Sequence, residues 1–300
     1  MNTQQLNAQQ YYETQGYFVY RNLIPTELVN ELLTRYQNEI VQSKYPFFRQ
    51  DTNKYEPNKI NEFGYVEQAF LDIHDYQQFP AFSTAAKNIF CSQLMQTALR
   101  EVTGFESFNL MQTMLFDANT ETTPHQDWWY LDSVPNGHLL GAWIALEDID
   151  ERAGRFYVIP ESIEVDLHSD TPDLPWLEWK QRMQTYLDNH ADQIKAPELK
   201  RGDVLFWNSR TIHGALLTTD PSFSRKSLTA HYLPSTLAFG NLFTKKDFVK
   251  YKTYQGVKFY RNQPDYSLIN QIKSGIKVAI YSQPKLLKTV RKLQAQVLSQ

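Results

Sequence analysis

The chain has 300 residues, 42% of them hydrophobic and 14% aromatic, which is enough to bury a sizeable core. Its single cysteine, Cys91, excludes an intramolecular disulfide framework and a multi-cysteine zinc site. The N-terminus has neither the basic start nor the apolar run of a signal peptide, and no uncharged stretch approaches the roughly twenty apolar residues of a membrane span. We expect one cytoplasmic domain over residues 1–300, as a monomer or homodimer.

The net charge of −3 conceals an asymmetry along the chain. Residues 245–300 contain twelve Lys and Arg against Asp247 and Asp265, a net charge of +10, which leaves −13 on residues 1–244. A basic segment of this kind either attracts an anionic partner or forms a solvated helix face. Coenzyme A, a carrier protein and an anionic surface are the candidate partners. We expect a small-molecule substrate and no nucleic acid.

The N-terminal part, residues 1–104, is expected to pack on the core. Residues 8–42 have the pattern of a helix, a short strand and an amphipathic helix, and residues 44–66 that of a long loop. One further helix is expected from Ala81 to Val102, with Gly104 as its stop. Its apolar face contains Ala85, Ile89, Leu94, Ala98 and Leu99.

The hydrophobic period changes to two from Phe105, which indicates strands. Apolar, strand-like runs recur at 139–146, 203–207 and 225–232, so we place a β core at 105–235. Residues 172–194 form an insertion with helical spacing, which acts either as a lid or as cover for a sheet edge. Residues 236–300 are expected to be basic and largely helical, starting near Tyr266. Their apolar stripe has three possible uses: packing on the body, pairing with another subunit, or lying on a membrane.

His125-Gln-Asp127 and the distant His213 are the candidate metal ligands. Two imidazoles and one carboxylate are the ligand set of a facial site for ferrous iron with open positions. On an extended backbone His125 and Asp127 point to the same face, so both can bind one ion. The alternative for His-x-Asp, without a role in metal binding, is a hydrogen-bonded pair in a surface loop.

Arg225 and Ser227 alternate onto one face of the strand that follows His213. Both can therefore meet one carboxylate, which Arg225 would hold in its guanidinium fork. His231 lies on the same face but is expected to be too far along the strand to bind the iron, so it is given no role. The histidines at positions 74, 168 and 190 lie in polar stretches and are expected at the surface.

The order of these motifs resembles the phytanoyl-CoA dioxygenase family of Fe(II)/2-oxoglutarate oxygenases. The resemblance extends to the run from Gly16 to Pro25 and to the central segment 141–160. It departs at Pro160-Glu-Ser-Ile163 and Asp117-Ala-Asn119, where many relatives have Pro-Gly-Ser-His and Lys-x-Pro, and these departures leave the metal set intact. The fold that the resemblance implies is a double-stranded β-helix (jelly roll, cupin-like) with helical additions at both ends.

The family's cofactors are Fe(II), 2-oxoglutarate and O2, and the resemblance implies a role for several residues. His125, Asp127 and His213 would bind iron, and Arg225 with Ser227 would bind 2-oxoglutarate. If the side chain of Gln112 points inward, Gln112 would also bind 2-oxoglutarate. If the side chain points outward, Gln112 would be a surface residue. Trp128, Trp129 and Tyr130 follow the ligands, so at least one of these rings should face substrate. Trp143 is either pocket wall or core.

The resemblance implies hydroxylation of a C–H bond, with succinate and CO2 as co-products. Related halogenases carry a small residue in place of the carboxylate, so Asp127 favours hydroxylation. Desaturation, epimerisation and cyclisation use the same oxidant and stay open. A metal-binding barrel without oxygenase activity, such as an isomerase or sensor, would have no need for Arg225 and Ser227. The substrate is expected to be an amphiphilic metabolite or an acyl group linked to coenzyme A or a carrier.

Overall fold

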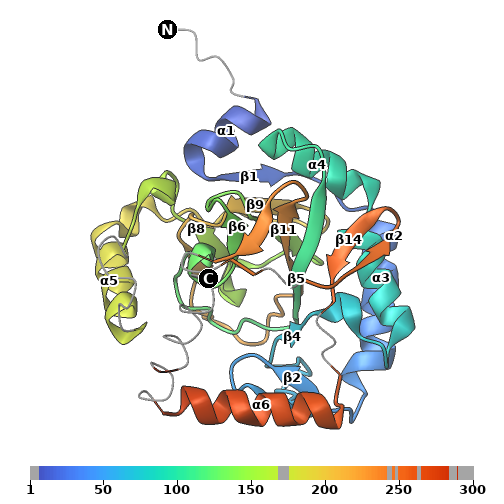
Figure 1. Ribbon diagram of the computed structural model, residues 1–300. Coiled ribbons are helices and arrows are strands. Elements are labelled where there is room, and N and C mark those ends of the chain that lie inside the picture. The colour runs from blue at the N-terminus through green and yellow to red at the C-terminus, as the bar shows by residue number, and fades with distance from the viewer. Residues whose placement is uncertain are drawn as a thin grey trace, which may run out of the picture.

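The computed structural model describes residues 7–167, 176–241, 245–246, 249–261, 265–283 and 289. Its centre is one large, mostly antiparallel sheet faced by short strand pairs (Figure 1). The strands of the large sheet are, in spatial order, β1 (Tyr17–Tyr20), β9 (Val204–Asn208), β7 (Leu140–Ala145), β11 (Ser227–Pro234), β5 (Phe108–Phe116), β14 (Val257–Tyr260) and β13 (Tyr251–Tyr254), with β4 (Phe70–Leu71) also beside β5.

The short strands build the rest of the core. β8 (Phe156–Val158) pairs with β10 (His213–Ala215), and β6 (Asp132–Val134) pairs with β12 (Ala238–Gly240). A separate hairpin consists of β2 (Phe47–Arg49) and β3 (Lys54–Glu56), inside the segment expected to be a long loop. The expected fold class, a mainly β jelly-roll core with flanking helices, is confirmed.

Helices from the N-terminal part pack on one face of the large sheet (Figure 1). They are α1 (Ala8–Gln15), α2 (Thr26–Arg35), a π-helical turn (Tyr36–Val41), α3 (Pro80–Phe90) and α4 (Gln93–Thr103). The single helix expected over 81–102 is wrong, because Ser92 starts a new helix: its Oγ accepts the backbone N–H of Met95 at 3.1 Å. Leu94, expected on the buried face, is 47% exposed, whereas Cys91 is buried.

The sheet continues beyond the boundary at 235 that the sequence suggested. β12 lies in the second layer, and the hairpin of β13 and β14 extends the large sheet. Gln255 and Gly256 form the hairpin turn with φ of 48° and 82°, which is the geometry of a two-residue hairpin turn. Residues 236–261 thus contain strands, and the described helix of the segment 236–300 is limited to Leu268–Tyr281.

Helix α5 (Trp176–Asn189) occupies most of the insertion, whose residues 172–175 lie outside the described residues. Trp179, Met183 and Leu187 are buried against Trp129, Tyr157, Ile159 and Ile212. No residue of α5 lines the cavity described below. Of the two uses considered, this packing matches cover of the core and not a lid.

Helix α6 (Leu268–Tyr281) lies next to the β2–β3 hairpin (Figure 1). Ser267 caps its N-terminus, and the Ser274 hydroxyl donates to the carbonyl of Asn53 in the hairpin turn. Its apolar stripe, for which three uses were considered, faces solvent at Leu268, Ile269, Ile272 and Ile276 and so does not pack on the described part of the body. The second stripe, from Leu286 to Val297, belongs to the part of the chain that is not described apart from residue 289. Within the described ranges, no helix has the length and apolar character that a membrane span needs.

Candidate metal centre

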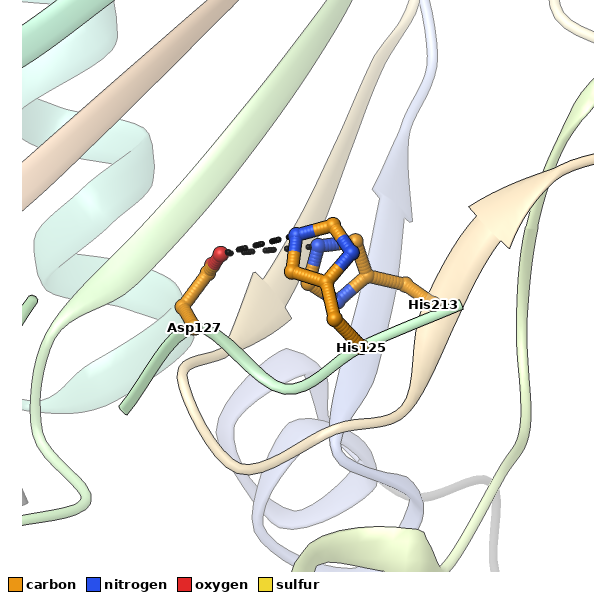
Figure 2. A group of neighbouring side chains, drawn as sticks. All are labelled: His125, Asp127 and His213. Carbon is orange, nitrogen blue, oxygen red and sulfur yellow. Dashed lines mark ion pairs between the residues drawn. The ribbon is translucent and has the colours of Figure 1, made fainter. Parts of the chain in front are cut away.

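His125, Asp127 and His213 converge at one point of the core (Figure 2). The backbones of His125 and His213 exchange two N–H to carbonyl hydrogen bonds of 3.0 Å, which hold the loop before Asp127 against the start of β10. Asp127 Oδ1 lies 3.5 Å from His125 Nε2 and 3.6 Å from His213 Nε2. One ion with bonds of about 2.1 Å can contact all three atoms.

Both imidazoles are oriented by backbone carbonyl groups. His125 Nδ1 lies 2.8 Å from the carbonyl of Thr123, and His213 Nδ1 lies 2.9 Å from that of Thr211. A carbonyl only accepts, so each Nδ1 carries the proton and each Nε2 presents a lone pair to the common point. Burial lowers the pKa of His213 to about 3. This histidine is therefore in its neutral, metal-binding form at pH 7.

The two oxygens of the Asp127 carboxylate have different surroundings. The indole Nε1 of Trp207 donates to Oδ2 at 2.8 Å, and His231 Nε2 lies 3.3 Å from the same oxygen. Oδ1 is the oxygen that faces His125 and His213. Although burial raises the pKa of Asp127, its neighbours His213 and His231 bring it well below the ordinary value. The carboxylate is therefore ionised, with Oδ1 turned toward the metal position.

Arg225 is a buried cation close to this cluster. It is 1% exposed, its Nη1 donates to the carbonyl of Gly154 at 3.2 Å, and its Nε has no partner. Within the described part of the chain, no carboxylate forms an ion pair with it. Burial lowers its pKa to about 10, so the guanidinium stays protonated at pH 7. A buried cation without a protein carboxylate fits a carboxylate brought by a small molecule.

The two predicted companions of Arg225 differ in position. Gln112 lines the cavity, opposite His231 in the β5–β11 register, so its side chain takes the inward of the two placements considered. The Ser227 hydroxyl donates to the carbonyl of Arg225 at 3.2 Å, and Ser227 is not part of the cavity wall. Strand alternation predicted Ser227 on the same face as Arg225. Its hydroxyl, however, is hydrogen-bonded to the neighbouring backbone and does not line the cavity.

The aromatic residues after Asp127 point in different directions. The guanidinium carbon of Arg210 lies 4.6 Å from the ring centre of Trp128. Trp129 stacks on Trp179, with 5.3 Å between the two ring centres. Neither lines the cavity. Tyr130 does, and its ring lies 5.9 Å from that of His125. Trp143 combines both expected roles, because it is buried against Phe156 and also forms cavity wall.

A cavity of about 850 Å³ contains the three converging residues and Arg225. Its size is in the range of sites that hold metabolite-sized ligands. Phe156, Trp207 and Thr229 complete the wall near the metal position. Strand β11 therefore lines the cavity at alternate positions, with Arg225 just before it and Thr229 and His231 along it.

His231 is the site residue that the sequence reasoning missed. It was expected to lie too far along β11 to bind the iron, and it is not among the three converging ligand residues, but its Nε2 lies 3.3 Å from Asp127 Oδ2. Strand alternation in the sequence correctly placed His231 on the same face as Arg225. The sequence does not show that this part of the strand lies beside the 125–127 loop. His74, expected at the surface, is fully buried, bridging Thr113 and the carbonyl of Tyr260. His190 is half-buried and contacts the carbonyl of Tyr186, and His168 lies outside the described residues.

Two histidines and one carboxylate inside a jelly-roll core are typical of non-haem iron oxygenases. The family model described as phytanoyl-CoA dioxygenase (PhyH) matches residues 12–226. The chain belongs to this family, and it is a 2-oxoglutarate-dependent iron dioxygenase.

Individual relatives are distant. Human peroxisomal phytanoyl-CoA dioxygenase is 24% identical over 245 residues, 77% of this chain and 69% of the relative. A probable phytanoyl-CoA dioxygenase of Caenorhabditis elegans is 27% identical, over 76% of this chain and 75% of its own. EctD from S. alaskensis with bound Fe has the same fold, with a TM-score of 0.54, 18% identity and 77% of each chain covered. So has the epimerase SnoN in complex with Fe3+, alpha ketoglutarate and nogalamycin RO, with a TM-score of 0.55, 18% identity and coverage of 84% and 94%.

Proposed function

We propose that this protein hydroxylates a C–H bond of a small amphiphilic molecule, with succinate and CO2 as co-products. The single observation that carries the proposal is the combination of a preformed metal-ligand set with a buried guanidinium in one cavity. A metal-binding barrel of another class has no use for a buried cation that lacks a protein carboxylate. Arg225 thus favours the oxygenase over an isomerase or sensor.

In this proposal His125 Nε2, Asp127 Oδ1 and His213 Nε2 hold the iron. Arg225 binds the distal carboxylate of 2-oxoglutarate, and Gln112 contributes an amide to the same ligand. When bound, iron and 2-oxoglutarate would together convert O2 into an oxidant strong enough to attack an unactivated C–H bond, one oxygen atom entering succinate and the other the product. The protein supplies the rest: the buried walls exclude water, and the cavity fixes which C–H bond is presented.

Desaturation, epimerisation and cyclisation use the same site, and the solved relatives include an epimerase and a carbocyclase by their titles. Asp127, as a third protein ligand, favours hydroxylation over halogenation, and the mass of the product distinguishes hydroxylation from the other three outcomes. The matched relatives are named for phytanoyl-CoA, an acyl chain joined to a phosphate-bearing carrier. A substrate of that kind, or a free amphiphile of similar size, suits a cavity that combines apolar and charged walls.

The proposed function is tested by succinate formation. Purified enzyme with Fe(II), ascorbate and 2-oxoglutarate is screened against acyl-CoA thioesters, free fatty acids, sugars and polyketides. The expected result is succinate formation above the uncoupled rate for one compound class, with a product heavier by one oxygen atom. A product of unchanged mass or one lighter by two hydrogens would replace hydroxylation by epimerisation or by desaturation or cyclisation. Absence of 2-oxoglutarate turnover with every compound, in iron-loaded enzyme, would reject the proposal.

His231 is assigned a positioning role. Together with Trp207 it surrounds Oδ2 of Asp127, so that Oδ1 remains directed at the metal position. We expect His231→Leu to weaken Fe(II) binding about 10- to 100-fold, as loss of an outer-shell partner generally does. Affinity is measured by competition with a chromogenic chelator, without turnover.

The matched control is Thr229→Val, two residues earlier on the same cavity-facing side of β11. It should leave Fe(II) affinity unchanged. His231→Gln keeps a side-chain N–H donor and should recover most of the affinity. If the Leu variant binds Fe(II) as tightly as wild type, His231 has no positioning role.

A further inference from the structure

The cavity that holds the metal position also reaches three lysines from the C-terminal part of the chain. Lys246, Lys273 and Lys277 line it together with the triad and Arg225. Asp127 and His213 are buried, whereas the three lysines reach solvent. The cavity therefore extends from a buried reaction centre to a solvent-accessible region with positive charge.

The orientation of α6 is unusual for a surface helix. Its cavity-lining residues are polar and recur at helical spacing: Asn270, Lys273, Ser274 and Lys277. Its isoleucines at 269, 272 and 276 face solvent instead. An amphipathic helix normally turns its apolar side inward. Here the inward amide of Asn270 donates to Asp265 and the hydroxyl of Ser274 donates to the carbonyl of Asn53, so the ammonium groups of Lys273 and Lys277 are the cationic groups that α6 brings to the cavity.

Lys246 and Lys277 lie close enough to influence one another. Partial burial lowers the pKa of Lys246, and the charge of Lys277 lowers it further. Burial also lowers the pKa of Lys277. Two ammonium groups held near each other gain from an anion placed between them.

Three acidic residues line the same cavity besides Asp127. Asp72 is buried and its Oδ1 accepts the backbone N–H of Thr113 at 3.3 Å. Asp51 is exposed in the turn between β2 and β3, and Glu121 is exposed in the loop that leads to the triad. Within the described residues, neither Asp51 nor Glu121 forms an ion pair with Lys246 or Lys273.

Apolar side chains provide the remaining wall. Met111, Met114, Leu131 and Phe239 line the same cavity. A ligand with an apolar body and one charged end matches this distribution, because each part then meets walls of its own kind.

We propose that Lys246, Lys273 and Lys277 form a subsite for an anionic group, a phosphate or a carboxylate, at the end of the substrate remote from the iron. This inference rests on the proposed function, since it names the class of substrate that the same cavity accepts. The lysines hold the charged end, the apolar walls hold the body, and the C–H bond to be oxidised lies toward His125 and His213.

The test is anaerobic calorimetric binding to enzyme loaded with Fe(II) and 2-oxoglutarate. The probes are decyl phosphate, decanoate and decanol, each below its critical micelle concentration. Wild type should bind decyl phosphate at least about tenfold more tightly than decanol, as expected for several partly buried charge pairs. The double variant Lys273→Gln/Lys277→Gln and the single variant Lys246→Gln should lose most of that preference and keep decanol binding unchanged.

Lys258→Gln is the matched control, because Lys258 is exposed on β14 and does not line the cavity. It should bind all three probes as wild type does. Equal binding of decyl phosphate and decanol, or an unchanged preference in the double variant, would overturn the proposal. Lysine-dependent binding to phosphatidylserine vesicles without any preference among the soluble probes would also overturn it, in favour of a membrane contact.

Failure of this subsite is distinguishable from failure of the proposed function. The visible absorption band of the Fe(II) and 2-oxoglutarate complex is recorded on the same samples. A normal band with no anion preference removes the lysine subsite alone. Loss of the band in wild type removes the proposed function, whatever the probes do.

Discussion

His213→Ala is expected to abolish tight Fe(II) binding and with it all 2-oxoglutarate turnover. The substitution removes one of the three atoms that face the metal position. Its effect should therefore exceed the roughly 10- to 100-fold loss that follows removal of an outer-shell partner. The measurement is Fe(II) affinity by chelator competition, with bound iron counted after gel filtration.

His138→Ala is the control for this experiment, because His138 is exposed and does not line the cavity. It should bind iron as wild type does. Because His213 is buried, circular dichroism is recorded on each variant, and His125→Ala provides a second, more exposed ligand position. Wild-type iron content in both folded alanine variants would remove these histidines from the metal site.

Arg225→Ala is expected to weaken 2-oxoglutarate binding by about 2 to 4 kcal/mol, or roughly 30- to 1000-fold in Kd, as for other buried charge-assisted contacts. Fe(II) affinity should change little, because Arg225 is not a metal ligand. Arg225→Lys keeps the charge but not the fork and should fall between wild type and alanine. The measurement is the 2-oxoglutarate concentration that half-saturates the Fe(II) complex.

The same substitution has an expected effect on stability. In the unliganded protein, Arg225 is a buried cation without a carboxylate partner, so removing it should not lower the free energy of unfolding by much. 2-Oxoglutarate at a hundredfold excess over the wild-type Kd should stabilise wild type by about 2.7 kcal/mol and the alanine variant by less than about 1 kcal/mol. If Arg225→Ala weakens binding of the organic substrate and leaves 2-oxoglutarate binding unchanged, the role assigned to Arg225 is contradicted.

Much of the fold follows from local patterns that the sequence shows directly. The helix, strand and helix over 8–42 and the strands at 105–116, 139–146, 203–207 and 225–232 all lie close to their observed positions. The predicted boundaries of helices and strands are wrong where a helix cap or a tight turn changes the direction of the chain. Ser92 divides the helix over 81–102, and the Gln255-Gly256 turn makes a hairpin beyond residue 235, where the β core was expected to have ended.

The sequence predicts those site residues that are related by the alternation of one strand. It does not predict contacts between segments that only the folded chain brings together. His125 with Asp127, and Arg225 with His231, share faces that alternation can identify. The contact of His231 with Asp127 depends on how β11 crosses beneath the 125–127 loop, which no local pattern specifies. The inward lysines of α6 were equally hidden, since an amphipathic pattern gives the two faces of a helix but not which one faces the protein.

The central claim, that the triad and Arg225 jointly bind Fe(II) and 2-oxoglutarate, is tested most directly by anaerobic absorption spectroscopy. Adding 2-oxoglutarate to the Fe(II)-loaded wild type should produce a weak visible charge-transfer band that saturates at one equivalent. Arg225→Ala should shift the titration to higher 2-oxoglutarate concentration, and His213→Ala should show no band. A wild-type protein that binds iron fully but shows no band at saturating 2-oxoglutarate would contradict the claim.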